Sequence, residues 1–166
     1  MEPRHNWLLS AAEGWLDLGL EEEAEREWEN LPSDVQGSLR GSEVAWRIHA
    51  KRRQWEDALA LSRKELDRYP DNVSPWLRLA FALRRARPQE VGVIEAQKVL
   101  LQVARKFPKE PVVAYNLACY ACQLGAPEKA IEWLRRAIKL GDRSTILAMA
   151  RADSDLVSMR DQLDAL

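Results

Sequence analysis

Four alanines recur at nearly constant intervals along the chain, and they constrain its fold more than any other feature. Each lies near the start of an amphipathic segment, and the intervals are 34, 38 and 34 residues: Ala24, Ala58, Ala96 and Ala130. A unit of this length holds two short helices, and such a pair cannot bury its apolar faces alone. Neighbouring units must therefore stack, which predicts an all-α solenoid of antiparallel helix pairs.

The segment from Pro111 to Ser144 shows such a helix pair most clearly. Its first half carries an apolar stripe at helical spacing that ends at Gly125, the residue type best suited to a left-handed position after a helix. Pro127 then opens a second helix, because proline is tolerated in the first helical turn. That helix is amphipathic and is expected to end at Gly141.

This unit resembles a tetratricopeptide repeat. Its small and large residues fall at consensus positions of that family: Leu117, Ala118, Gly125, Ala130, Leu134 and Ala137. The resemblance implies a right-handed α-solenoid of about four repeats, which we expect at 5–38, 39–72, 73–110 and 111–144. Residues 145–166 are expected to form a helical C-terminal cap over the last apolar face, so that 1–166 is a single domain.

Two repeats depart from the family pattern. In the second, Trp46 occupies a normally small position and Arg53 replaces the turn glycine, which leaves the helix register of that repeat open. The third contains four extra residues, which we place between its helices, within 84–94. Its first helix is expected to start with Ser74 as N-cap and Pro75 in the first turn.

Composition and charge exclude several classes of protein. A formal net charge of −1 offers no general attraction to nucleic acid or to an anionic membrane. No apolar run approaches the roughly 18 to 20 residues of a membrane span. Two cysteines do not make a disulfide framework, which is typical of a reducing compartment. We therefore expect a cytoplasmic protein that does not bind membranes. The arginine stretch Arg84, Arg85 and Arg87 leaves nucleic-acid binding as an alternative, for which one short patch is weak evidence.

Cys119 and Cys122 form the one motif that could carry chemistry. A zinc site needs four ligands, and the two histidines, His5 and His49, belong to distant repeats. A redox pair normally lies at a helix N-terminus in a βαβ context, whereas these cysteines fall inside a predicted helix. We interpret them as reduced, partly buried thiols, and the sequence predicts no catalytic residue, no metal and no cofactor.

Two further groups of residues are interpreted as structural. The seven tryptophans are expected to pack between helices, with Trp7 as the exception because no unit precedes it. Asp153 and Asp155 resemble part of a calcium loop, but the glycine and the terminal glutamate of that motif are missing. Capping of the last helix explains this pair better.

The family resemblance also implies a concave groove lined by the first helix of each repeat. The inward positions include acidic residues in the first repeat, Glu13 and Asp17, and Cys119, Cys122 and Gln123 in the fourth. We expect the ligand to contact a basic and aromatic set: Arg47, Lys51, Arg78, Phe81, Arg84, Arg85, Tyr115 and Asn116. Because arginine can hold a carboxylate with two hydrogen bonds, Arg78 and Arg84 are expected to anchor an acidic ligand. Phe81 and Tyr115 would supply apolar contacts.

The sequence thus predicts a non-catalytic interaction module or scaffold that binds an acidic peptide or protein in its groove. One alternative is a structural assembly subunit that uses its ends or its convex face. Another is a thiol oxidoreductase that uses Cys119 and Cys122. The sequence leaves the partner's identity and the oligomeric state open, because one scaffold serves many functions.

Overall fold

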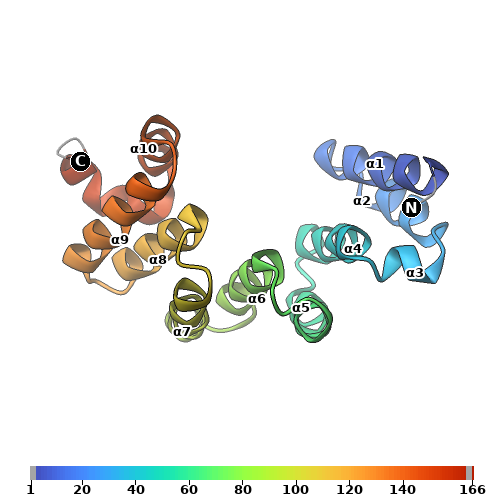
Figure 1. Cartoon of the computed structure of the whole chain (residues 1–166), viewed down its shortest axis with the longest axis horizontal. Coiled ribbons are helices and arrows are strands. Elements are labelled where there is room, and N and C mark those ends of the chain that lie inside the picture. The colour runs from blue at the N-terminus through green and yellow to red at the C-terminus, as the bar shows by residue number, and fades with distance from the viewer. Residues whose placement is uncertain (1–2, 164–165) are drawn as a thin grey trace. The chain divides into compact units, whose positions relative to one another are not determined.

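The computed structural model describes residues 3–163 and 166, and every element within them is helical (Figure 1). The α-helices and the one 3₁₀ segment, η1, follow in chain order: α1 Pro3–Asp17, α2 Glu21–Glu29, α3 Ser33–Gln36, α4 Leu39–Lys51, α5 Trp55–Arg68, α6 Val73–Ala86, α7 Gln89–Lys106, α8 Pro111–Gln123, α9 Pro127–Leu140, α10 Arg143–Ala152, η1 Ser154–Met159 and α11 Arg160–Leu163. The outermost residues of the predicted domain and cap, 1, 2, 164 and 165, lie outside the described residues.

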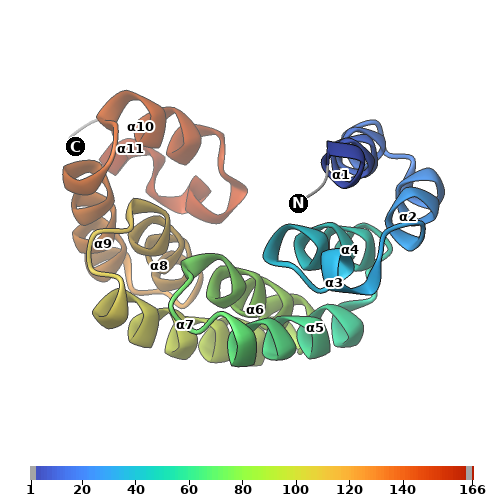
Figure 2. The ribbon, with the colours of Figure 1, turned by 45° about the vertical axis from the view of Figure 1, so that its right-hand side comes forward.

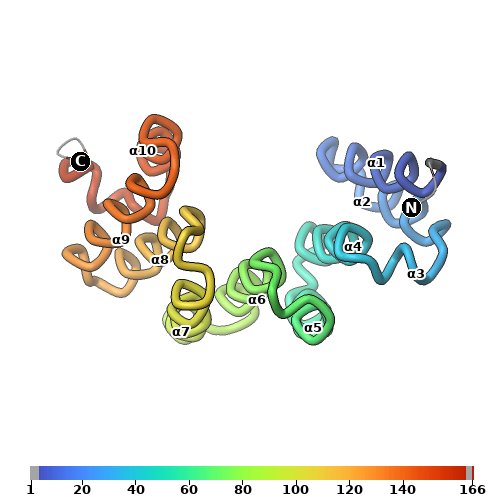
Figure 3. Tube along the Cα trace, viewed as in Figure 1, coloured from blue at the N-terminus to red at the C-terminus, as the bar shows by residue number. Residues whose placement is uncertain are grey.

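The chain forms two compact units, Met1–Ala82 and Leu83–Leu166. In the first, α1 packs on α2, α4 packs on α5, and α1 also contacts α4 (Figure 2). In the second, α8 packs on α9 and on α7, and α10 contacts α9 (Figure 3). The predicted all-α fold of sequential antiparallel helix pairs is confirmed. The prediction that 1–166 is a single domain stays a prediction.

The four recurring alanines are buried completely. Each has a relative exposure of 0%, and each lies in the second helix of a pair: Ala24, Ala58, Ala96 and Ala130. A methyl side chain lets two helix backbones approach closely, so any larger residue would have to displace a neighbouring helix. The alanines therefore recur because two helices make a close contact at the same position of each repeat.

Three of the inter-helix turns have the same backbone conformation. The residue in the left-handed region is Gly19 (φ +75°), Arg53 (φ +58°) or Gly125 (φ +71°). In all three the next amide donates over 2.9 Å to a carbonyl five residues earlier: Leu20 to Trp15, Gln54 to His49 and Ala126 to Ala121. This is the Schellman motif, which satisfies carbonyls at a helix end. Arg53 thus takes the place of the turn glycine without changing the turn.

The four extra residues of the third repeat lie in a helix, and the expectation that they separate two helices is wrong. Only Arg87 and Pro88 lie between α6 and α7, whereas α7 has 18 residues against 14 in α5 and 14 in α9. Four residues make about one helical turn, so the insertion lengthens α7 without rotating its apolar face far. Gly92 permits α7 to lie close against the end of α6, because a Cβ at this position would lie 2.7 Å from the Arg84 carbonyl oxygen.

The first repeat contains a short helix that the sequence analysis did not predict. Pro32 follows the end of α2, and α3 begins immediately after it. The start of α4 packs against α3 so closely that a Cβ on Gly41 would lie 2.1 Å from the Val35 carbonyl oxygen. The indole Nε1 of Trp28 donates to the Gly41 carbonyl over 2.8 Å and fixes this corner.

Most tryptophans pack as expected. Trp46 is 8% exposed, and Trp7, the predicted exception, is 65% exposed. The predicted N-cap at Ser74 is wrong by two positions: α6 begins at Val73, and the Asn72 carboxamide oxygen accepts from the Ser74 amide over 2.9 Å. Among the described residues, no helix combines the length and the apolar character needed to cross a membrane.

Candidate functional site

The predicted groove residues fall into two sets, one in each compact unit. The first unit holds Arg47 and Lys51 on α4 with Arg78 and Phe81 on α6. The second unit holds Arg84 and Arg85 at the end of α6 with Tyr115 and Asn116 on α8.

Arg78 is a buried partner of an ion pair. Its guanidinium donates from Nε and Nη2 to the two carboxylate oxygens of Glu65 on α5, over 3.0 and 2.9 Å. Arg78 is 8% exposed and Glu65 is 1% exposed, while Glu43 lies 3.4 Å from Nη1. Burial raises the pKa of Glu65, and the hydrogen bonds from Arg78 act against that rise. The fork of Arg78 is therefore already engaged inside the first unit.

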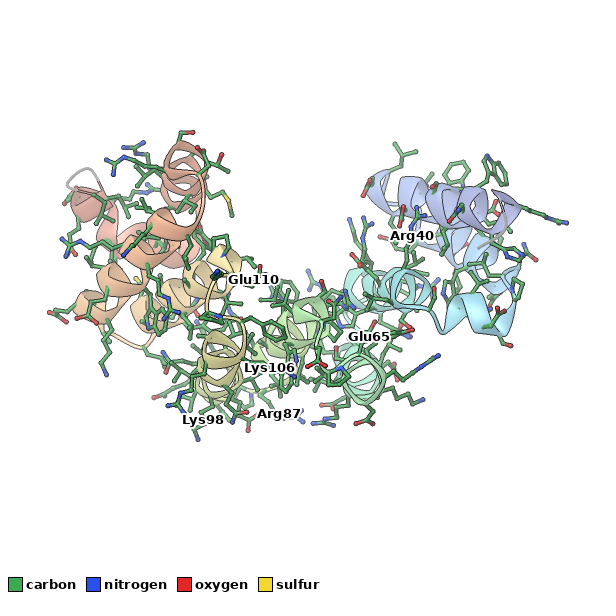
Figure 4. The ribbon with its side chains drawn as sticks, in the orientation of Figure 1. Arg40, Glu65, Arg87, Lys98, Lys106 and Glu110 are labelled. Atoms are coloured by element: carbon green, nitrogen blue, oxygen red, sulfur yellow. The ribbon has the colours of Figure 1, made fainter. Side chains whose placement is uncertain are left out.

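The acidic residues of α1 pair with the basic residues of α4. Arg40, labelled in Figure 4, donates to both carboxylate oxygens of Glu13 over 2.8 and 2.6 Å. Arg47 donates to Asp17 over 2.5 Å. The hydrogen bond from Arg40 lowers the pKa of Glu13. The acidic and basic inward positions of the first unit thus neutralise one another, and Lys51 remains exposed at the end of α4.

Phe81 belongs to an aromatic cluster in the first unit. Its ring lies 5.6 Å from that of Trp46, at 70° to it, and 6.1 Å from that of Trp55. Edge-to-face contacts of this kind stabilise beyond the area they bury. Phe81 is still 37% exposed, so its outer face lies on the surface of α6.

In the second unit, the predicted inward positions of α8 form one stripe along the helix. Tyr115, Cys119 and Cys122 recur at intervals of four and three residues, which places them on one face. The alanines at 114, 118 and 121 are buried. Packing of the small residues thus determines which residues α8 presents at the site.

This face of α8 contacts the C-terminal segment through two carboxylates. Arg84 donates from Nη1 and Nη2 to the two oxygens of Asp155 over 2.5 and 2.7 Å. Gln123 donates from Nε2 to Asp155 over 2.5 Å. The Tyr115 hydroxyl donates to Asp153 over 2.9 Å, and the Cys119 thiol lies 3.5 Å from the same oxygen. We call Arg84, Tyr115, Cys119 and Gln123 the carboxylate site.

The electrostatics of the carboxylate site favour a charged arginine and neutral hydroxyl and thiol groups. Burial lowers the pKa of Arg84, but its hydrogen bonds to Asp155 and the electrostatic interactions with Asp155 and neighbouring groups together outweigh burial, and the pKa is raised. Burial, followed by interactions with Asp153, raises the pKa of Tyr115. Burial also raises the pKa of Cys119, as does the charge of Asp153. Every donor therefore keeps its proton at neutral pH.

The surroundings of Cys119 favour a neutral thiol. Both cysteines are free, and Cys119 is buried. Redox and metal-binding cysteines react as thiolates, whereas the raised pKa of Cys119 favours the thiol. Its sulfur and the carboxylates of Asp153 and Asp155 lie within 4.8 Å of one another. Asp155 is already held by Arg84 and Gln123, so this donor set does not suit a cation.

Sequence reasoning placed Arg84 and Tyr115 in a binding site but missed the residues that they bind. Asp153 does cap η1, because its side chain accepts from the Asp155 amide over 2.9 Å. The sequence interpretation did not predict that the same pair lies against α8. Asn116 donates to the Val112 carbonyl of its own helix over 2.8 Å, and Arg85 is exposed. Neither residue is therefore assigned to the carboxylate site.

An apolar cavity of about 340 Å³ borders the carboxylate site between the starts of α8 and α10. Tyr115 lines the cavity and also belongs to the carboxylate site, where its hydroxyl donates to Asp153. Met149 on α10 and Val112 on α8 also line it and are 47% and 38% exposed. A peptide side chain of aliphatic character would fit beside the carboxylate site.

The fold defines the class of protein. Its helix pairs repeat with completely buried alanines and Schellman turns, and this arrangement is a tetratricopeptide-like helical repeat fold. No family model matches the chain, and no curated protein matches it. The chain is similar to a solved structure described as the crystal structure of TTC0263, a thermophilic TPR protein in Thermus thermophilus. The two share 16% identity with a TM-score of 0.73 over 97% of this chain and 95% of that one. The predicted resemblance is thus confirmed for the fold.

Proposed function

We propose that the chain is a non-catalytic interaction module that binds an acidic segment of a protein partner. One observation carries the proposal: Arg84 and Gln123 hold one carboxylate, and Tyr115 holds a second two residues away. Charge-assisted hydrogen bonds of this kind are about twice as strong as neutral ones. Arg85, an exposed cation at the end of α6 in the same unit, would add attraction over a longer range. A cytoplasmic location stays a prediction.

Affinity capture with charge-reversed variants tests this function. We expect the variant R85E to lose partners that the wild type captures, because the reversed charge would repel acidic segments from the carboxylate site. The matched control K129E changes the same charge on an exposed position of α9, a second helix, and should retain those partners. Mass spectrometry identifies the captured proteins. Equal capture by both variants would exclude a basic groove as the binding surface.

A structural assembly subunit is the second candidate, because apolar side chains are exposed at one end of the first unit. Trp7 on α1 is 65% exposed, and Leu18, next to the first turn, is 71% exposed. Such groups favour self-association when they form a contiguous patch. Light scattering over a range of concentrations separates the two functions. A mass that stays monomeric excludes assembly through this end.

A further inference from the structure

The C-terminal segment occupies the inward face of α8 in the second unit. Tyr115 and Cys119 contact Asp153, Gln123 contacts Asp155, and the Cys122 sulfur lies 3.2 Å from the Ser158 hydroxyl. Four of the inward positions predicted on α8 are therefore used by this chain's own residues 153–158. The face on which a ligand was expected already holds a peptide.

Residues 153–158 present two carboxylates to α8, as the proposed acidic ligand would. Its two carboxylates are two residues apart, and each has its own donors at the carboxylate site. Asp153 also caps the Asp155 amide over 2.9 Å, which fixes the spacing of the two carboxylates. The Arg84 guanidinium lies 5.7 Å from the centre of the Tyr120 ring, and this contact helps to orient its fork toward Asp155. The site is thus built to recognise an Asp-x-Asp pattern.

The internal segment does not satisfy every group at the site. The Gln123 Oε1 atom is buried and has no hydrogen-bond partner among the described residues. A buried acceptor without a donor costs free energy that a bound amide N–H would recover. A ligand whose backbone supplied such an N–H would therefore make one hydrogen bond more than the internal segment does.

Apolar burial sets the cost of displacing the segment. Leu156 is 0% exposed and Met159 is 1% exposed, whereas Val157 is 48% exposed. Leu156 and the adjoining Met159 are therefore apolar anchors that hold the segment in addition to its carboxylates. A partner must compete with these anchors. Its apparent affinity is its intrinsic affinity multiplied by the fraction of molecules in which the site is open.

We infer that residues 153–158 are an internal ligand of the carboxylate site, which an Asp-x-Asp segment of a partner protein binds after displacing them. The inference rests on the proposed function. It adds that the ligand has the pattern Asp-x-Asp and that residues 153–158 compete with it. The binding surface is consequently regulated by the chain's own C-terminal segment. Weakening that segment increases binding of acidic peptides, and removing the Arg84 fork abolishes it.

A labelled synthetic peptide of residues 150–163, ARADSDLVSMRDQL, provides the test with the full chain. The double variant D153N/D155N loses the internal carboxylates but keeps Leu156 and Met159. Fluorescence anisotropy should give a Kd for this variant that is about tenfold or more below that of the wild type. The reason is that the two substitutions remove charge-assisted hydrogen bonds from residues 153–158 but not from the added peptide. Adding R84M to the variant should remove the gain.

The control D34N/D57N removes two exposed carboxylates from the first unit and should bind the peptide as weakly as the wild type does. Hydrogen exchange of the wild type covers the case in which D153N/D155N fails to fold: excess peptide should accelerate exchange at residues 154–159. The inference is overturned if D153N/D155N gains no affinity, or if excess peptide leaves wild-type exchange unchanged. Partner capture that depends on Arg85 would then still support the proposed function.

Discussion

At the scale of single residues, Arg53 carries the clearest departure from the pattern of the other turns. Its φ of +58° lies in the region that glycine occupies at the equivalent turns, and its Schellman hydrogen bonds are intact. The sequence showed that a glycine was replaced but left the register open. Hydrogen bonds and helix packing on both sides of the turn impose the conformation that the side chain disfavours.

The substitution R53G should stabilise the protein. A non-glycine residue in the left-handed region costs about 1–2 kcal/mol, and the extra freedom of glycine in the unfolded chain returns roughly 0.5–1 kcal/mol of this. We expect a net gain of about 0.5 kcal/mol, measured as a higher urea midpoint at unchanged slope. The control R63G, in the exposed interior of α5, should lose about 1 kcal/mol.

The ion pair between Glu65 and Arg78 should give a strongly non-additive mutant cycle. Either E65L or R78M alone leaves one charge in the first unit without its buried partner and should cost about 3–5 kcal/mol. The double variant E65L/R78M leaves neither charge and should cost less than either single change. Chemical denaturation of the four proteins provides the cycle. Additive costs would show that the two side chains are not coupled.

The variant R78M should also change the dependence of stability on pH. Burial raises the pKa of Glu65, and without Arg78 the hydrogen bonds that oppose the rise are absent. A carboxyl with a raised folded pKa binds more protons in the folded state, so stability falls as the pH increases from about 4, the unfolded pKa, through the folded pKa. Urea denaturation between these limits should show a steeper fall for R78M than for the wild type. A smaller slope would contradict the assigned burial of Glu65.

At the scale of elements, the four extra residues of the third repeat form a helical turn at the start of α7 and not a loop. The sequence located the insertion correctly but could not show its conformation, because charged and apolar residues there suit a helix and a loop equally. The short helix α3 was missed for a similar reason. Its close contact with Gly41 and the burial of Val35 order this segment of four residues, and both contacts are tertiary.

The close approach of α7 to the end of α6 predicts the effect of G92A. An added Cβ would lie 2.7 Å from one backbone oxygen and 2.9 Å from another, and backbone cannot move as a side-chain tip does. We expect a loss of about 1–3 kcal/mol in the free energy of unfolding. The matched control G14A lies in α1 with nothing within 4 Å, and it should gain roughly 0.5–1 kcal/mol. Equal effects of both substitutions in calorimetry would contradict the packing.

At the scale of the whole molecule, the repeat period alone predicted the all-α class and the helix pairs. The division into two units at Ala82 and Leu83 was not predicted, because the turns and stripes on either side look alike in sequence. The candidate site was predictable only in part. Positions carried over from the family resemblance drew attention to Arg84 and Tyr115, but such positions do not show that Asp155 and Asp153 of the same chain lie opposite them.

Arg78 illustrates this limit and the signal that was missed. Its partner Glu65 follows Ala58 and Ser62 on the buried stripe of α5, where an acidic residue is out of place. A charge on a buried stripe implies a buried counter-charge. The position of Glu65 could therefore have indicated that Arg78 is engaged within the chain. The tail pair Asp153 and Asp155 gave no comparable signal, because capping alone explained both residues.

Hydrogen exchange of the C-terminal segment in the presence of a captured protein partner tests the central claim most directly. The amides of residues 154–159 should exchange faster when the partner binds, while α8 becomes more protected, because the partner's acidic segment replaces the internal one. Stable binding with unchanged exchange in residues 154–159 would contradict the account, since the partner would then bind elsewhere on the molecule.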